Sequence, residues 1–290
     1  MWRTLSVSPP ARHRPCARRV ASSTSSRRAK GVGVELPEHT SASQLNTYAS
    51  CPRKYSLRYL EKTPPEDRSP SLVLGSVVHS AIGWFFEAKI TGESPAPVDA
   101  AELARADFAA EVDGPPIRWG RWTPADLLDH AMRLVSFFLE QRGDLPVEDV
   151  EQRFTVDLTH PTTGEPLPRP LLGYFDLRLQ GGRLVELKTS RSGYKPADLA
   201  GNLQFGAYAA AIEALDLESL DVLVLVKSRS PRLQELQVKP SPTRVRWFLD
   251  AALAIERAIA AGHFPPAPSW ACKTCEYRSR CLGHVVQSAA

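Results

Sequence analysis

Hydrophobic positions recur with helical spacing in the first half of the chain. Leu45, Tyr48 and Leu57 fall on one face of a helix that begins near Ser41 and is interrupted near Pro52. Ser41 and Gln44 fit a capping box at its start. Further helices are predicted at 72–90 and over 99–142, with a loop at 115–116. This half of the chain is therefore predicted to be helical.

The second half carries strand-like patterns. Strands are predicted at 150–158, 171–179, 183–189, 222–226 and, more weakly, 233–239, with helices at about 197–215 and 243–261. Gln180-Gly-Gly182 is typical of the turn of a hairpin, so the second and third strands are expected to pair. The order strand, strand, helix, strand predicts a mixed sheet with helices on its faces, an α/β class of fold.

Composition narrows the class of protein. The chain has 290 residues, of which 43% are hydrophobic and 23% charged, as in ordinary globular proteins. It has no run of 18 apolar residues, so neither a membrane-spanning helix nor a membrane partner is expected. Five cysteines, an odd number, argue against a secreted disulfide scaffold.

Charge is unevenly distributed. Residues 1–34 hold eight Lys and Arg and no acidic residue, which leaves 28 basic against 32 acidic residues in the remainder. Residues 1–40 are expected to form a disordered basic tail, and 284–290 a C-terminal tail. The basic tail fits a nucleic-acid-binding arm, a transit peptide or an unselected extension. Any nucleic-acid contact of the acidic body must come from a local groove.

Two carboxylates and a lysine are predicted to meet on the hairpin. Glu186 and Lys188 are two residues apart on a strand and share a face, with Asp176 across the turn and Phe175, Leu177 and Leu179 on the opposite, buried face. Such a cluster suits Mg²⁺, which takes one or two carboxylates and keeps several waters. The alternative is a solvated strand face with a salt bridge.

Two helices add polar pairs at helical spacing. Gln204 and Tyr208 share one helix face, as do Gly75 and His79 on the earlier helix. Each residue alone is equally consistent with packing or a surface role. Together with the carboxylates and the lysine they form an ordered set.

Cysteines cluster near the end of the chain. Cys272, Cys275 and Cys281 follow a Pro-rich loop, and the first two have metal-ligand spacing. Cys51, far upstream, is the natural fourth ligand. Zinc and an iron–sulfur cluster are both open from ligand type, and His263 or His284 could replace a cysteine in a zinc site. The alternative is that these cysteines are incidental.

The combination resembles the RecB-like exonucleases of the PD-(D/E)XK superfamily, in the branch that carries a [4Fe–4S] cluster. The resemblance covers roughly 41–283 and rests on Ser43 to Tyr55, Gly75 to His79, Gly173 to Asp176, Glu186 to Lys188, Gln204 to Tyr208 and the cysteine trio. It implies a restriction-endonuclease-like core in a single domain, with a helical insertion at about 95–145 and a clasp made of residue 51 and 272–281.

The resemblance also implies roles for individual residues. Asp176, Glu186 and the carbonyl of Leu187 would bind Mg²⁺ or Mn²⁺, and His79 would be an additional metal ligand. Lys188 would position the attacking water, and Gln204 with Tyr208 would shape the site and contact DNA. The implied cluster ligands are Cys51, Cys272, Cys275 and Cys281, with structural zinc as the alternative cofactor.

The expected activity is that of a metal-dependent DNA exonuclease acting on single strands or DNA ends in repair or recombination. Alternatives are a CRISPR- or phage-linked nuclease that processes DNA intermediates, and a non-catalytic DNA-end-binding subunit. The chain has no P-loop motif, so a helicase or recombination partner would supply any ATP-driven movement. The expected location is the bacterial cytoplasm, or the mitochondrion if the tail is a transit peptide.

Overall fold

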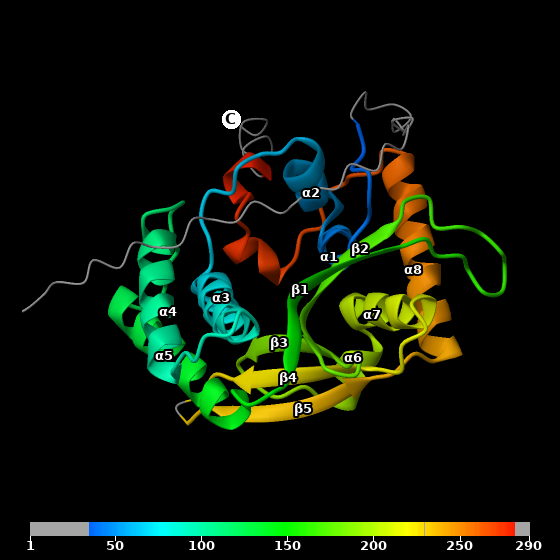
Figure 1. Ribbon diagram of the computed structural model, residues 1–290. Coiled ribbons are helices and arrows are strands. Elements are labelled where there is room, and N and C mark those ends of the chain that lie inside the picture. The colour runs from blue at the N-terminus through cyan, green and yellow to red at the C-terminus, as the bar shows by residue number, and fades with distance from the viewer. Residues whose placement is uncertain (1–34, 229, 282–290) are drawn as a thin grey trace, which may run out of the picture.

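A five-stranded sheet with helices on both faces forms the centre of the protein (Figure 1). The computed structural model describes residues 35–228 and 230–281, so the predicted tails and His284 lie largely or wholly outside them. The helices are α1 (Ala42–Ser50), α2 (Pro52–Tyr55), α3 (Pro70–Ile90), α4 (Pro97–Val112), α5 (Pro124–Arg142), α6 (Pro196–Ala200), α7 (Leu203–Ala214) and α8 (Pro242–Ala260). The strands are β1 (Val147–Val156), β2 (Leu171–Leu179), β3 (Leu184–Ser190), β4 (Leu220–Val226) and β5 (Arg232–Val238). A π-helical turn, Ser56–Leu60, follows α2, and a 3₁₀ turn, Trp270–Thr274, lies near the end.

Three long helices begin with the same local signal. The side chains of Ser69, Thr123 and Ser241 accept hydrogen bonds from backbone N–H groups of α3, α5 and α8, and each is followed by a proline. A hydroxyl at this position satisfies a free N–H group, and proline suits the first helical residue. Helix α3 therefore starts two residues, and α8 one residue, earlier than hydrophobic spacing alone predicts, whereas α5 starts later than the predicted loop at 115–116 implies.

The sheet is mixed, with strand order β1-β2-β3-β4-β5. Only β3 and β4 are parallel, and α6 and α7 form the connection between them. The hairpin prediction is confirmed: the Leu179 N–H donates to the Arg183 carbonyl at 2.7 Å, and Gly181 and Gly182 have positive φ. The predicted mixed sheet and α/β class are therefore confirmed.

Strands β2 and β3 separate soon after their turn. Their register contains only two pairs, Leu177 with Val185 and Arg178 with Leu184. On the other side β2 pairs with β1 along nearly its whole length, with a register shift between Val147 and Asp149. Glu151, which lies opposite Asp176 in this register, has a φ of +53°. The sheet is thus forked between β2 and β3.

The fork corrects one prediction. Phe175, Leu177 and Leu179 were expected to share one buried face, but Phe175 packs in one hydrophobic cluster while Leu177 and Leu179 pack in the other. The regular two-residue period assumes a flat strand, whereas β2 follows the bend of β1. Asp176 lies at this change of face.

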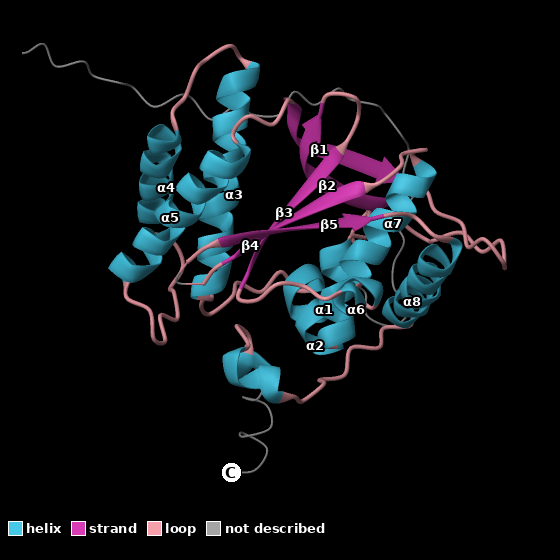
Figure 2. Ribbon diagram, turned by 90° about the horizontal axis from the view of Figure 1, so that it is seen from below, coloured by secondary structure: helices cyan, strands magenta, loops and turns pink. Residues whose placement is uncertain are grey.

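Two hydrophobic cores cover the two faces of the sheet (Figure 2). One packs α7 and α8 against β4, and the other packs α3, α4 and α5 against the opposite face. Among the described residues α3 is the one helix long and apolar enough to span a membrane by length and composition. Half of its most apolar window is buried, and it packs into the second core.

Candidate active site

The hairpin brings the predicted carboxylates together. The Asp176 Oδ2 atom accepts a hydrogen bond from the Leu187 N–H at 2.6 Å. Glu186, on the neighbouring strand, is 3% exposed. The ammonium of Lys188 forms an ion pair with Glu186 Oε1. Because β2 leaves β3 at the fork, the Leu187 N–H bonds to the Asp176 side chain, and this bond fixes the carboxylate beside Glu186.

Helix α7 positions Glu186 from one side. The Tyr208 hydroxyl lies 2.6 Å from Glu186 Oε2 and 3.2 Å from the Tyr174 carbonyl. The Gln204 amide donates to Glu186 Oε1 at 3.2 Å. The predicted i, i+4 pair therefore does share one face, and that face is directed at a carboxylate. Asn202 caps the helix through the Gln204 N–H, which fixes where the helix begins.

Helix α3 approaches from the other side. His79 Nδ1 lies 3.5 Å from Asp176 Oδ1. A Cβ atom added to Gly75 would lie 3.4 Å from the Thr189 hydroxyl, so the helix passes close to β3 at this position. His79 thus lies beside a predicted metal-binding carboxylate, as its predicted role requires.

Ionisation differs sharply between the two carboxylates. Burial and the charge of Asp176 raise the pKa of Glu186 to about 7. Burial opposes ionisation of Asp176 as well, but His79, the Leu187 N–H and Lys188 together lower its pKa below the usual value. Burial and Glu186 raise the pKa of Tyr208 well above its usual value, so its hydroxyl stays a donor. Two carboxylates this close favour a cation between them.

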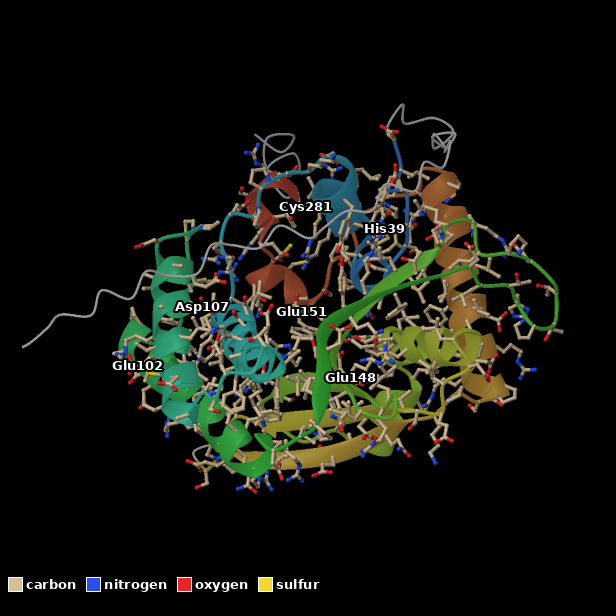
Figure 3. The ribbon with its side chains drawn as sticks, viewed as in Figure 1. His39, Glu102, Asp107, Glu148, Glu151 and Cys281 are labelled. Atoms are coloured by element: carbon tan, nitrogen blue, oxygen red, sulfur yellow. The ribbon has the colours of Figure 1, made fainter. Side chains whose placement is uncertain are left out.

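A cavity of about 330 Å³ opens onto these groups. Asp176, Glu186, Gln204 and Tyr208 line it, together with two residues that the sequence analysis missed: His39 and Tyr174. Figure 3 shows His39, near the start of the described chain. Tyr174 is 49% exposed. Its position two residues before Asp176 on a strand could have predicted that the two side chains share a face. His39 precedes the first helix and carried no such signal.

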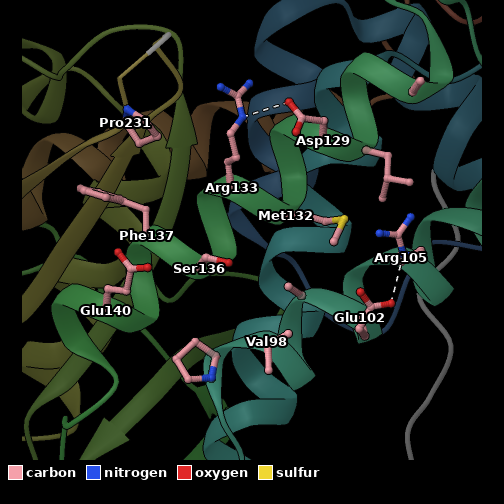
Figure 4. Close-up of a pocket in the computed structure, with 14 residues that line it drawn as sticks. Val98, Glu102, Arg105, Asp129, Met132, Arg133, Ser136, Phe137, Glu140 and Pro231 are labelled. Atoms are coloured by element: carbon pink, nitrogen blue, oxygen red, sulfur yellow. Dashed lines mark hydrogen bonds and ion pairs between the residues drawn. The ribbon is translucent and has the colours of Figure 1, made fainter.

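A larger cavity lies elsewhere. It measures about 880 Å³ between α4 and α5 (Figure 4) and contains none of the predicted site residues. Its lining includes the ion pairs Arg105–Glu102 and Arg133–Asp129. Size alone does not identify an active site, and the titratable groups converge at the smaller cavity.

The four predicted cluster cysteines share another cavity, of about 510 Å³. Cys51 stands between α1 and α2, and Cys281 lies near the other end of the described chain (Figure 3). Burial and the neighbouring thiols Cys51, Cys275 and Cys272 raise the pKa of Cys281. Backbone and side-chain contacts join the two segments: the Arg53 N–H donates to the Pro265 carbonyl at 3.2 Å, and Lys54 pairs with Glu276 at 2.9 Å.

Neither cavity holds a complete set of side-chain metal ligands. Among residues 35–228 and 230–281, no three His, Cys, Asp or Glu side chains are arranged to hold an ion. At the carboxylate site two side-chain ligands are enough for Mg²⁺, because this ion can complete its coordination with a backbone carbonyl and water molecules. At the cysteines the donor type suits zinc or an iron–sulfur cluster, and the thiols face one cavity without reaching ligand spacing. His263, the alternative zinc ligand, does not line this cavity.

Comparison with known proteins agrees with this geometry. The family model of the PD-(D/E)XK nuclease superfamily matches residues 39–282. A candidate exonuclease from Eubacterium rectale superposes with a TM-score of 0.55 at 13% identity, over 83% of this chain and 88% of that chain, a likeness of fold. The protein SSO0001 superposes less well, with a TM-score of 0.36 at 12% identity, over 82% of this chain and 92% of that chain. No curated protein sequence matches the chain.

Proposed function

Because the chain belongs to the PD-(D/E)XK nuclease superfamily, we propose that it is a metal-dependent DNA nuclease, an exonuclease acting on single strands or DNA ends. The superfamily implies hydrolysis of phosphodiester bonds. Three further points are part of the proposal: that the enzyme digests DNA from an end, that it needs a metal ion, and that it acts in repair or recombination. The observation that carries it is that Asp176 and Glu186 line one cavity, with Lys188 bound to Glu186 by an ion pair.

The donor set at this cavity fits a hard divalent cation. Asp176 and Glu186 supply carboxylate oxygens, and the Leu187 carbonyl is the neighbouring backbone acceptor. Mg²⁺ or Mn²⁺ bound there would polarise the scissile phosphate and lower the pKa of a bound water. His79 would act beside Asp176, as a further ligand or as the group that orients that carboxylate.

The chain's own residues have separable tasks in hydrolysis. Lys188 orients the attacking water and offsets charge on the phosphate, and its ion pair with Glu186 fixes the ammonium. The attacking water gives up a proton to solvent as its oxygen bonds to phosphorus, the phosphorus–oxygen bond to the sugar breaks, and the departing oxygen takes a proton from solvent. Gln204 and Tyr208 hold Glu186 in place and are positioning residues.

We further propose that the chain belongs to the RecB-like branch whose nuclease core carries a [4Fe–4S] cluster. Support comes from the donor chemistry. Among the described residues that line the 510 Å³ cavity, the four cysteines are the only Cys or His side chains. Bound by Cys51, Cys272, Cys275 and Cys281, a cluster would join the first helix to the end of the nuclease core. Anaerobically purified protein should then be brown and contain iron, whereas a colourless protein with stoichiometric zinc would contradict the cluster.

The nuclease proposal is tested with purified full-length protein and end-labelled single-stranded DNA. With Mg²⁺ or Mn²⁺ the wild type should shorten the DNA, and Lys188→Ala and Asp176→Asn should not. Labels at the 5′ and the 3′ end would show the direction of digestion. Equal cleavage by the wild type and both variants would indicate a contaminant, and no cleavage by any would contradict the proposal.

A further inference from the structure

A fourth cavity with a distinct chemistry lies where β3 and β4 end. Its volume is about 360 Å³, and its lining comes from the start of α5 and from the segment after β4. The lining residues with polar or charged side chains are Arg121, Trp122, Asp126, Asp129, His130, Arg133, Lys227 and Ser228. None of them belongs to the carboxylate site or to the cysteine cavity.

The cavity is lined by more cationic than anionic side chains. Arg133 pairs with Asp129 at 3.0 Å, a contact visible in Figure 4, and Asp126 accepts a hydrogen bond from the Thr123 hydroxyl at 2.6 Å. Within the described part of the chain, Arg121 and Lys227 have no carboxylate at ion-pair distance. The lining therefore carries three cations against two carboxylates, a net charge of +1, and neither Arg121 nor Lys227 takes part in an ion pair among the described residues.

Lys227 has a reason to accept an anion. Its side chain is partly buried, and burial together with Arg191 lowers the pKa of this lysine. A partly buried ammonium without an opposite charge is unfavourable, and an anion in the cavity would relieve that cost.

His130 supplies a second, independent feature. This residue is 6% exposed, and its Nε2 atom has no hydrogen-bond partner among the described residues. Its Nδ1 atom lies 3.4 Å from the Arg133 guanidinium, which can only donate. The ring proton is therefore assigned to Nε2, and burial with the charges of Arg133 and Lys227 lowers the pKa of His130 and keeps the ring neutral. The cavity thus has a buried donor without an acceptor.

The cavity lies at the end of the strand that carries Glu186 and Lys188. The Lys227 N–H donates to the Ser190 carbonyl at 2.8 Å, and Ser190 is the last residue of β3, two residues beyond Lys188 and four beyond Glu186. Four strand residues span about 13 Å, the length of about four nucleotides along one strand of duplex DNA. A DNA strand cleaved beside Glu186 would therefore reach this cavity about four nucleotides from the cleaved bond.

We propose that the cavity binds a backbone phosphate of the DNA strand, a few nucleotides from the bond that is cleaved; this inference rests on the nuclease function proposed above. The ligand is the phosphodiester and not the base, because Trp122 is already in contact with Arg121 and His130. The charge is local: outside residues 1–34 the chain has 28 basic and 32 acidic residues, so a general basic surface does not account for it.

The test compares two charge-matched double variants. Arg121→Ala with Lys227→Ala removes the two unpaired cations, and Lys239→Ala with Arg246→Ala removes two exposed cations at and beyond the far end of β5. Binding of a fluorescent oligothymidylate is measured in EDTA at several salt concentrations. The first variant should bind about tenfold more weakly, and its slope of log affinity against log salt should fall by about 0.7 per lost phosphate contact. The control should change less than twofold.

A third variant guards against a folding defect. Arg121→Lys with Lys227→Arg keeps both charges and should bind within about threefold of the wild type, with the normal salt slope. Equal losses in the first variant and the control would overturn the proposal, as would tight binding of inorganic phosphate that both Ala changes abolish without affecting the oligonucleotide. A wild type that binds but never cleaves, with the same loss in the first variant, would refute the nuclease function and leave this cavity assigned.

Discussion

The carboxylate site and the cysteine cavity are held together in different ways. At the carboxylates, side chains from two strands and two helices bond directly to one another. Glu186 by itself bonds to three of them: Lys188, Gln204 and Tyr208. At the cysteines, the contacts that join the two chain segments are made by neighbours such as Lys54 and Glu276, while no thiol bonds to another among the described residues. Trp270, beside the cysteines, is 85% exposed.

The difference separates a site assembled by the fold from one that depends on an added group. Sheet pairing and helix caps are sufficient to bring the carboxylates together, because each link is a hydrogen bond between regular elements. The cysteine segment has a short 3₁₀ turn, Trp270–Thr274, with no buried residue, followed by one helical turn after the buried Tyr277. We therefore expect changes at the first site to affect catalysis and changes at the second to affect stability.

The largest effect is expected at Asp176. Asp176→Asn removes a metal-binding charge and should lower kcat by about a thousandfold or more, because metal stabilisation of a transition state is worth several kcal/mol. The thermal midpoint should stay close to that of the wild type. Asp107→Asn, at a partly exposed carboxylate on α4 (Figure 3), is the matched control and should retain full activity. A variant at Asp176 that cleaves normally would remove Asp176 from the site.

The next largest effect is a loss of stability at the cysteines. Cys281→Ser should lower the free energy of unfolding by about 2–5 kcal/mol, because a cluster that closes so long a loop restricts the unfolded chain. Denaturant unfolding of anaerobic protein measures this loss. In Cys16→Ser the loss should be absent, because Cys16 lies in the basic tail and is no predicted ligand. Unchanged stability in Cys281→Ser would show that the cysteines form no clasp.

A smaller effect is expected at Tyr208. Tyr208→Phe removes the hydroxyl that contacts Glu186 Oε2 and leaves the ring packed against Phe175. A hydrogen bond to a charged group contributes about 1.5–3 kcal/mol, so kcat should fall about tenfold or somewhat more. KM should change little, since a positioning residue acts through Glu186. Loss of binding without loss of kcat would instead place Tyr208 in direct contact with DNA.

The smallest effect concerns pH without divalent cations. Glu186 binds its proton more tightly in the folded state, with the pKa raised from 4.5 to about 7. Its contribution to stability is therefore complete below pH 4.5 and is lost as pH rises toward 7. Thermal midpoints measured in EDTA between pH 4 and 8 should fall in the wild type relative to Glu186→Gln over that window. Parallel curves for the two proteins would contradict the raised pKa.

Much of the fold and of the site geometry follows from sequence pattern. The hairpin, the mixed sheet and the shared face of Gln204 and Tyr208 depend on local periods, and the structure shows each of them. The segment 99–142 was expected to break at 115–116, but α4 ends at Val112 and α5 starts at Pro124. Ile117, Trp119 and Trp122 in the loop pack against the second core, which hydrophobic spacing cannot separate from helix.

Other features depend on contacts between distant parts of the chain. Arg169 donates to Glu256 at 2.7 and 3.0 Å in the interior and also to the carbonyls of Pro37 and His39. No local pattern marks either residue as buried, because a charged side chain in a loop or on a helix is ordinarily solvated. This pair fixes the segment before α1, including the backbone of His39 at the carboxylate cavity.

The fork between β2 and β3 makes the spacing of the two carboxylates a property of the backbone. Asp176 moves with the β1–β2 ribbon and Glu186 with the remaining three strands, and a single bond from the Leu187 amide joins the two parts at this point. The angle between the two parts of the sheet thereby sets the separation of the Asp176 and Glu186 side chains. Glu151, with its positive φ, lies opposite Asp176 in the β1–β2 register, so a change in the β1 backbone at this residue should displace Asp176 relative to Glu186.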